Sequence, residues 1–351
     1  MSDDRLIRAQ GDDDARLLDA AVRRRIAVAV ADVRLPASLR LTEWQRATVA
    51  ALASKMVRAV EDDLRTSLAD SAPARESEAL HAALTSAHVA IAAPMLERSG
   101  AYADAPFVSA LISRAEEHRR ARIRGTGETA FLLELVRDKD EAVAEEAMAI
   151  LIAHSRRFDL FSEPVAARTE LAAELEHRLV WRVAAALRLY MVERHAIAPA
   201  SADEAVVAAA ERMLAEYDEG DAFEARCVRL ARHLRDLGRL DDRVVERSLS
   251  EGSFPLFLAA IAVRASLTHG AAWEIVSDPR GRGAALLLRA AGIGRPEAAS
   301  ILLSLAASDD EEEIAAQLDL FDVTSQASAR ESLRLWQADP GYRDALAELA
   351  A

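Results

Sequence analysis

Two pairs of glutamate and histidine stand three positions apart, which is a spacing that metal sites on helices use. The pairs are Glu78 with His81 and Glu174 with His177. Residues at i and i+3 share one face of a helix, and two such pairs with two further glutamates form the di-iron site of ferritin-like bundles. Such pairs also arise by chance in a helical chain rich in glutamate. We therefore favour a solvated surface over a carboxylate–histidine metal site for these four residues.

One histidine, His118, lies in a run of charged residues from Glu116 to Arg120. Phosphotransfer modules present one solvent-facing histidine on a helical bundle, so His118 is the candidate phosphoacceptor. The alternative is a charged, solvated helix end, where protonated histidine and arginine interact favourably with the negative end of the helix dipole. We favour this alternative, and both hypotheses expect His118 to be exposed.

Arginines on both sides of that histidine form the densest positive patch besides residues 23–25. The patch consists of Arg114, Arg119, Arg120, Arg122 and Arg124. It could bind an acidic partner or a phosphate, but it lacks interleaved aromatic residues for stacking on nucleic-acid bases. Pairing with carboxylates of the same chain is the favoured interpretation.

The usual patterns of catalytic residues do not occur in the sequence. It has no Ser-His-Asp pattern, no zinc-ligand spacing and no Gly-x-Ser-x-Gly elbow. Residues 281–283 (Gly-Arg-Gly) lack the preceding strand and the Lys-Ser/Thr of a phosphate loop. The single cysteine, Cys227, falls in an apolar-periodic segment and is predicted to be a buried thiol. We expect no enzymatic activity and no cofactor.

The composition indicates an all-α protein. Of 351 residues, 51% are hydrophobic but only 5% aromatic, and glycine (13) and proline (10) are sparse. Alanine and leucine dominate the apolar set and lose little side-chain freedom in helices. The net charge of −14 repels phosphate backbones, so nucleic-acid binding is not expected. Without a signal peptide, an internal disulfide or a long apolar run, a cytoplasmic protein with no membrane contact is expected.

Helical periodicity marks two long helices that would position these side chains. One follows Thr42 as N-cap and carries apolar residues at helical spacing to about Asp70. The other opens at Pro164 and carries an apolar stripe at i+4 spacing over residues 171–191. The Pro-containing stretch 197–200 is the best candidate domain boundary. We predict an N-terminal helical extension (1–40), a helical-repeat domain (41–196) and a C-terminal helical domain (197–351).

Residues 88–96 and 142–151 are similar to each other. Each follows an apolar helix and a short polar turn, and each carries small residues that would let neighbouring helices approach closely. This order is typical of stacked helical repeats such as HEAT. It predicts an array of antiparallel helix pairs, that is, an α-solenoid.

Several segments, in their order and spacing, carry a family resemblance. They are residues 60–65 (VEDDLR), 89–99 (VAIAAPMLERS), 252–260 (GSFPLFLAA) and 277–281 (SDPRG). On them the chain resembles the domain of unknown function 2336 family, found mainly in alphaproteobacteria. The family usually has an Asn-Asp pair where this chain has residues 85–88 (TSAH). The resemblance implies a helical-repeat, cytoplasmic protein, and it carries over no activity and no catalytic residues.

These observations favour a noncatalytic protein–protein interaction scaffold or adaptor whose stacked helices present a groove to another protein. The alternatives are a histidine phosphotransfer module using His118 and, less favoured, a metalloprotein using the glutamate–histidine pairs. The partner's identity and the oligomeric state are not fixed by the sequence.

Overall fold

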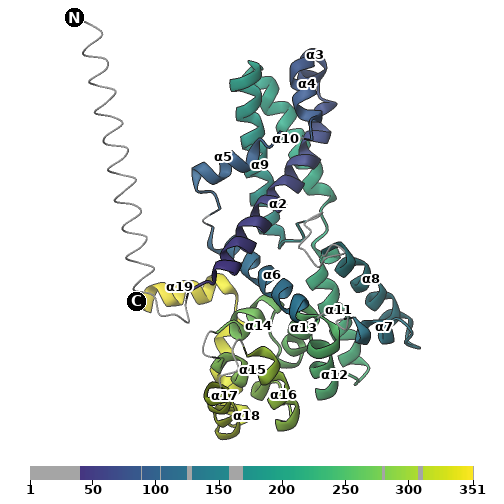
Figure 1. The fold of residues 1–351 in the computed structure, drawn as a ribbon, viewed down its shortest axis with the longest axis vertical. Coiled ribbons are helices and arrows are strands. Elements are labelled where there is room, and N and C mark those ends of the chain that lie inside the picture. The colour runs from purple at the N-terminus through teal and green to yellow at the C-terminus, as the bar shows by residue number, and fades with distance from the viewer. Residues whose placement is uncertain are drawn as a thin grey trace, which may run out of the picture. The chain divides into compact units, whose positions relative to one another are not determined.

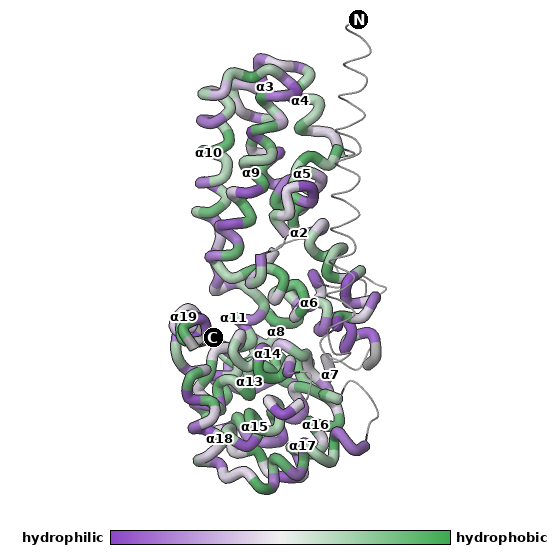
Figure 2. Tube along the Cα trace, turned by 90° about the vertical axis from the view of Figure 1, so that its left-hand side faces the viewer, coloured by the Kyte–Doolittle hydropathy of each residue, from purple (hydrophilic) through white to green (hydrophobic). Residues whose placement is uncertain are grey.

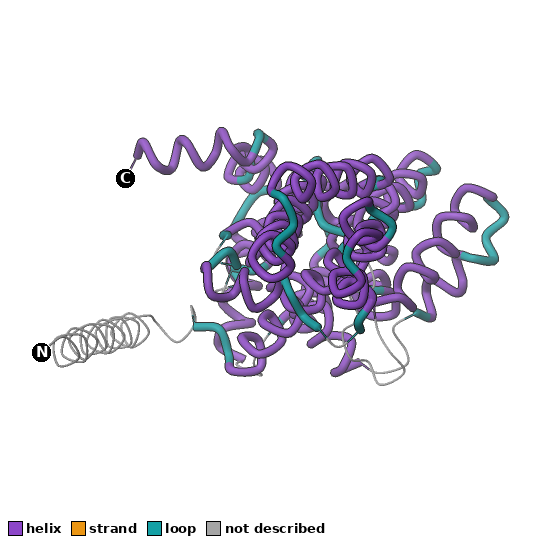
Figure 3. Tube along the Cα trace, turned by 90° about the horizontal axis from the view of Figure 1, so that it is seen from above, coloured by secondary structure: helices purple, strands orange, loops and turns teal. Residues whose placement is uncertain are grey.

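A computed structural model describes residues 40–87, 89–102, 104–124, 129–157, 169–278, 281–306 and 311–350, without the side chains of residues 123, 124, 344, 347 and 350. Within these ranges the chain forms helices, turns and loops and contains no strand (Figure 3). The prediction of an all-α protein is confirmed. The chain divides into a unit Met1–Glu43 and a compact unit Trp44–Ala351. The predicted extension 1–40 lies almost wholly outside the described residues.

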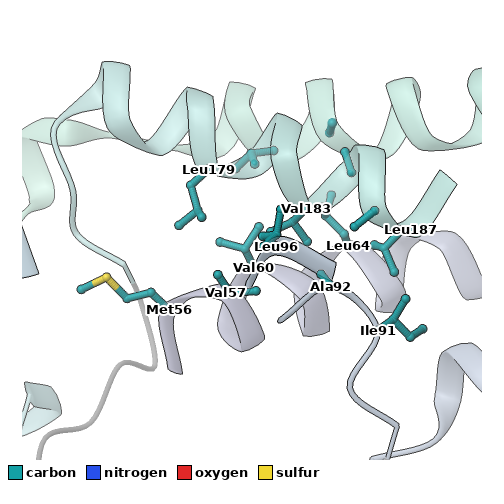
Figure 4. Packing of buried hydrophobic residues seen from close by; sticks show 14 of the residues in the cluster. Met56, Val57, Val60, Leu64, Ile91, Ala92, Leu96, Leu179, Val183 and Leu187 are labelled. Atoms are coloured by element: carbon teal, nitrogen blue, oxygen red, sulfur yellow. The ribbon is translucent and has the colours of Figure 1, made fainter. Parts of the chain in front are cut away.

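The first hydrophobic cluster is built on two long helices, α2 and α9, with shorter helices around them (Figures 1 and 4). Its helices are α2 (Glu43–Ala69), α3 (Ala72–Glu76), α4 (Glu78–Thr85), α5 (Ala92–Ser99), α9 (Ala173–His195) and α10 (Pro199–Glu216), with the first half of α6 (Ala105–Arg124). The predicted stripe on α2 is confirmed, because Leu52, Met56, Val60, Leu64 and Leu68 are all buried. Figure 4 shows this face of α2 against Leu179, Val183 and Leu187 of α9.

A buried ion pair on α2 fixes the connection from α4 to α5. Arg65, which is 4% exposed, donates to four carbonyl oxygens, and Glu61 accepts from the N–H groups of Ile91 (2.8 Å) and Ala92 (2.9 Å). The acceptors of Arg65 are Leu84 (2.9 Å), Val89 (2.7 Å), Ala83 (2.8 Å) and Ser86. A carboxylate is stabilising at a helix N-terminus. Glu61 and Arg65 both belong to the 60–65 motif, so this motif holds the turn and starts α5.

The two segments interpreted as repeats differ in structure. Residues 142–151 lie inside α8 (Glu141–Arg157), whereas Val89, Ala90 and Ile91 precede α5 and are not helical. Glu61 and Arg65 take up the backbone groups of this stretch. The two segments therefore share a helical backbone only from Ala92 onward, and the first part of the sequence resemblance is not a resemblance of conformation.

Helix α9 begins at Ala173, later than the sequence predicted. Residues 169–172, which precede it, are not helical. Pro164, the predicted start, lies outside the described residues. The predicted stripe is buried at Leu171 and from Leu179 to Met191. A left-handed residue, Ala196 (φ 54°), caps α9, and a short turn leads into α10, which packs into the same cluster. The domain boundary at 196/197 stays a prediction, although the hydrophobic cluster continues across it.

Two further hydrophobic clusters share helix α13 (Phe254–Ala265). One contains α7 (Ala130–Leu135), α8 and α11 (Phe223–Asp236), the last preceded by the 3-10 turn η3 (Glu219–Asp221). The other contains α12 (Asp242–Arg247), the π-helical turn η4 (Ser248–Gly252), α14 (His269–Val276), α15 (Arg282–Ala290), α16 (Arg295–Leu305), α17 (Glu311–Val323) and α18 (Gln326–Ser332). The chain closes with η5 (Arg334–Gln337) and α19 (Pro340–Ala350). The first nine residues of α13, Phe254 to Ala262, are buried, and the helix is largely hydrophobic in Figure 2.

Within the described residues, no single helix has both the length and the apolar composition to cross a membrane. Helices α13 and α14 have this length and composition only when they are counted together, and a bend of 105° separates them.

Candidate functional site

The four residues of the glutamate–histidine pairs lie on the surface. Glu78, His81, Glu174 and His177 are all exposed. His81 Nδ1 lies 3.3 Å from the Ala69 carbonyl oxygen, and His177 Nε2 accepts from the Trp181 indole N–H at 3.1 Å. In the part of the chain that the structure describes, no group of three or more histidine, cysteine, aspartate or glutamate side chains gathers in a way that could hold a metal ion. The geometry does not bring the two pairs together as a site.

His118 is buried, and the expectation of an exposed histidine was wrong. Its side chain is 1% exposed, because the charged side of α6 faces other helices rather than solvent. Burial, together with the positive charges of Arg114 and Arg157, lowers the pKa of His118 to about 3. A phosphoacceptor must reach its donor, so this position does not favour the phosphotransfer hypothesis.

The low pKa of His118 predicts a stability that depends on pH. Between pH 6.5 and 3 the unfolded chain binds a proton at His118 that the folded chain does not, so the free energy of unfolding falls as the pH falls through this window. At about pH 4 the loss amounts to ~3 kcal/mol. We expect His118→Leu to reduce the difference in unfolding free energy between pH 7 and pH 4 by about this amount, because leucine binds no proton. The change in packing is the same at both pH values and cancels in the comparison. Urea unfolding at the two pH values measures the difference. The same change at exposed His81 serves as the control, and an equal effect there would contradict the prediction.

The predicted arginine patch is not a surface patch. Arg114 and Arg120 are buried, Arg122 is exposed, and the side chain of Arg124 lies outside the described residues. Glu116 pairs with both Arg119 (2.8 Å) and Arg120 (2.7 Å), and Arg120 also donates to carbonyl oxygens at the end of α16. Pairing within the chain, the favoured interpretation, is confirmed for Arg114, Arg119 and Arg120. The physical reason is that arginine can be buried where carboxylates and carbonyls accept its hydrogen bonds.

The residue at the centre of the buried charges is one that the sequence did not single out. Arg157, the last residue of α8, is 2% exposed and pairs with three carboxylates. Its guanidinium donates to Glu117 of α6 (2.8 Å), to Glu170 (2.8 Å) and to both carboxylate oxygens of Glu224 of α11 (2.9 and 2.8 Å). It also lies over the ring of Phe223, 4.3 Å from the centroid. Together with Arg114, these residues are called the Arg157 network below.

A second buried arginine ties the start of the α9 segment to the Arg157 network. Arg114 of α6 donates to the carbonyl oxygens of Thr169 (2.7 Å) and Glu170 (3.3 Å), and its guanidinium lies 3.6 Å from the Glu170 carboxylate. Glu170 has a left-handed backbone with φ 46°. A non-glycine residue in this region is uncommon and is held there by its surroundings. Here the surroundings are the two arginines.

The charges of the Arg157 network shift one another's ionisation. Burial raises the pKa of Glu117, and Arg157 opposes this only in part. Burial also acts against ionised Glu224, but Arg157 and Arg114 outweigh it and hold the pKa of this carboxyl at about 2. Burial would lower the pKa of Arg157, yet the three carboxylates raise it above the ordinary value. The guanidinium therefore stays charged inside the protein.

An acidic cleft of 440 Å³ borders the Arg157 network. Its lining comes from α2, α8, α10, η3, the start of α11, the first turn of α9 and the segment before it. The charged lining residues are Asp63, Glu170, Glu176, Glu216, Asp218, Asp221, Arg156 and Arg226. The apolar lining residues are Ala59, Val60, Ala149, Ile152, Ala153, Met213 and Ala222. Six carboxylates against two arginines give the cleft a negative character.

Two titratable groups of the cleft are held by internal hydrogen bonds. The Thr169 hydroxyl donates to the buried Glu176 carboxylate, and the Tyr217 hydroxyl donates to the carbonyl oxygen of Leu171. Burial raises the pKa of Glu176, and it raises that of Tyr217 with the help of nearby carboxylates. Both bonds hold residues 169–172 between α9 and α10, so the wall of the cleft is fixed from two sides.

Comparison with known proteins gives one match. Residues 91–334 match the model of a family described as uncharacterised proteins conserved in bacteria, DUF2336. The chain belongs to this family. The resemblance drawn from the sequence is thereby confirmed. The matched range contains every residue of the Arg157 network, whereas Ala59, Val60 and Asp63 of the cleft precede it. No curated protein and no solved structure matches the chain.

The DUF2336 family carries no established activity, so the chemistry of the cleft must be judged from its residues. Its carboxylates are suited to a cation, and its aliphatic wall is suited to the carbon chain that carries one. Ile152 on this wall is 46% exposed and would be covered by a ligand. The arrangement can therefore bind a side chain of lysine or arginine with an apolar neighbour.

Proposed function

We propose that the chain is a noncatalytic interaction protein, a scaffold or adaptor, that holds a cationic segment of a partner protein in the acidic cleft. The observation that carries this proposal is the composition of the cleft, which is lined by six carboxylates and by apolar side chains. Charge complementarity of this kind sets the choice of partner and the rate of encounter. The net charge of −14 adds long-range attraction for a basic segment.

The position of the cleft supports a peptide segment as the occupant. Its walls come from helices that are far apart in sequence, and the cleft is open to solvent along the side formed by Asp218 and Glu216, which are exposed. An extended or helical peptide could lie across such an opening with one basic side chain inside. An array of helix pairs of HEAT type belongs to the same proposal, supported by the packing of α7 on α8 and of α9 on α10.

A cationic peptide will bind, and the binding will depend on the carboxylates of the cleft. The probe is a short fluorescein-labelled peptide in which arginine alternates with leucine, and the readout is fluorescence anisotropy at moderate salt. We expect Asp63→Asn with Glu216→Gln to weaken binding about fivefold to tenfold, because each exposed ion pair contributes up to ~1 kcal/mol.

Matched controls come from the same two helices. Asp62 on α2 and Glu211 on α10 are exposed and lie outside the cleft lining. The variant Asp62→Asn with Glu211→Gln has the same net charge as the test variant and should bind the probe as the wild type does. Equal losses in both variants would mean that the peptide follows only the overall charge, and the proposal would then fail. A peptide with glutamate in place of arginine should not bind.

A further inference from the structure

Glu170 belongs to two structures at once. Its carboxylate is paired with Arg157 at 2.8 Å and lies 3.6 Å from Arg114, inside the protein. The same residue lines the acidic cleft, and 13% of its side chain is exposed. A positive group that enters the cleft therefore meets a carboxylate that already serves two arginines.

The remaining members of the Arg157 network do not depend on Glu170 alone. Arg157 also holds Glu117 and both oxygens of Glu224, and Arg114 also holds the carbonyl oxygen of Thr169. Removing the Glu170 carboxylate therefore weakens the network, but both arginines keep at least one hydrogen-bond acceptor. In contrast, the left-handed backbone of Glu170 (φ 46°) is held by its hydrogen bonds to these arginines, and it can relax when they loosen.

We propose that Glu170 is the residue through which the cleft recognises a guanidinium or ammonium group, and that this group competes with Arg157 and Arg114 for its carboxylate. The inference rests on the proposed function, since it takes the cationic segment of the partner as the ligand. Occupation of the cleft then loosens the junction of α6, α8 and α11, which Arg157 joins through Glu117 and Glu224. Binding at the surface is in this way transmitted to the interior.

The junction contains its own reporter. Cys227 of α11 is the one cysteine in the sequence, and its side chain is 0% exposed. It lies one helical turn after Glu224 and Phe223, the residues of α11 that Arg157 contacts. A buried thiol reacts with a disulfide reagent only when its surroundings open, so the labelling rate measures the opening of this part of α11.

The experiment follows the labelling of Cys227 by a chromogenic aromatic disulfide in the native full chain, with and without a saturating amount of the arginine–leucine peptide. We expect the peptide to raise the labelling rate by about threefold or more, because it shifts the junction toward its open form. Anisotropy on the same samples measures binding separately. If the peptide binds and the labelling rate stays the same or falls, the inference is wrong and the proposed function stands. If the peptide does not bind at all, both fail.

Two variants separate recognition from coupling. In Glu170→Gln we expect a higher labelling rate without peptide, weaker peptide binding and no further acceleration at saturation. Asp221→Asn changes a cleft carboxylate that pairs with Arg226 (2.6 Å) rather than with the Arg157 network. It should weaken binding but keep the acceleration once the cleft is saturated. Acceleration that persists in Glu170→Gln would overturn the inference, and so would its loss in Asp221→Asn. Circular dichroism checks that each variant is folded.

Discussion

Replacing Arg157 with methionine will lower the free energy of unfolding by about 3–5 kcal/mol, the cost of removing one partner from a buried ion pair. Methionine fills much of the volume and keeps apolar contact with Phe223, but it leaves the carboxylates of Glu117, Glu170 and Glu224 without their common donor. Urea unfolding followed by circular dichroism measures the change. If α8 separates from α6 and α11 before the rest of the chain unfolds, the slope of the unfolding free energy against urea concentration will also fall.

The neighbouring arginine provides a matched control for this prediction. Arg156 is exposed, carries the same charge and stands on the same last turn of α8. Arg156→Met should change the free energy of unfolding by less than about 0.5 kcal/mol. Adding Glu117→Leu to Arg157→Met should recover about 1–2 kcal/mol, because it removes a buried carboxyl that has lost its partner. Equal losses for the two arginines would show that the buried pairs contribute nothing.

The contrast between these two arginines also shows where sequence reasoning ends. Both stand side by side at the end of a helix. The apolar stripe of α8, with Val143, Ala147, Ile150 and Ala153, places Arg157 on the buried face, but it does not show which residues pair with the guanidinium. The partners of Arg157 stand 40 residues before it, in Glu117, and 67 residues after it, in Glu224. Only the tertiary packing of α6, α8 and α11 brings them together. The acidic cleft was missed for the same reason, since its carboxylates come from separate elements.

Apolar periodicity, in contrast, predicted the helices that are built on a continuous hydrophobic stripe. The extent and the buried face of α2 followed from the spacing of its apolar residues, and the burial of Cys227 followed from the periodicity of α11. Sequence reasoning failed for His118, because a run of charged residues was taken as solvated although paired charges can be buried. It also failed at the start of α9, where Thr169 and Leu171 use their carbonyl oxygens to accept from Arg114 and Tyr217 instead of forming a helix.

Replacing Arg65 with methionine will have an effect of similar size, for a different physical reason. Arg157 satisfies charged groups, whereas Arg65 satisfies backbone carbonyls in the last turn of α4 (Ala83 and Leu84) and in the stretch after it (Ser86 and Val89). A buried carbonyl without a donor costs about 1–3 kcal/mol, so the loss of several at once predicts a destabilisation of ~3–5 kcal/mol. Glu61 loses its buried counter-charge in the same variant, which adds to the cost.

The location of the damage distinguishes this prediction from a general loss of stability. In Arg65→Met, amide hydrogen exchange should rise first in residues 83–87 and 89–92, because Arg65 and its partner Glu61 hold the backbone there, and only later in α2 itself. Arg58→Met, two turns earlier on α2 at an exposed position, should leave both the exchange and the free energy of unfolding unchanged. Arg65→Lys keeps the charge but lacks the planar fork that reaches several acceptors at once, so it should recover only part of the stability. Full recovery by lysine would mean that the charge facing Glu61 matters and the carbonyl bonds do not. The turn from α4 to α5 would then be held by its own backbone rather than by Arg65.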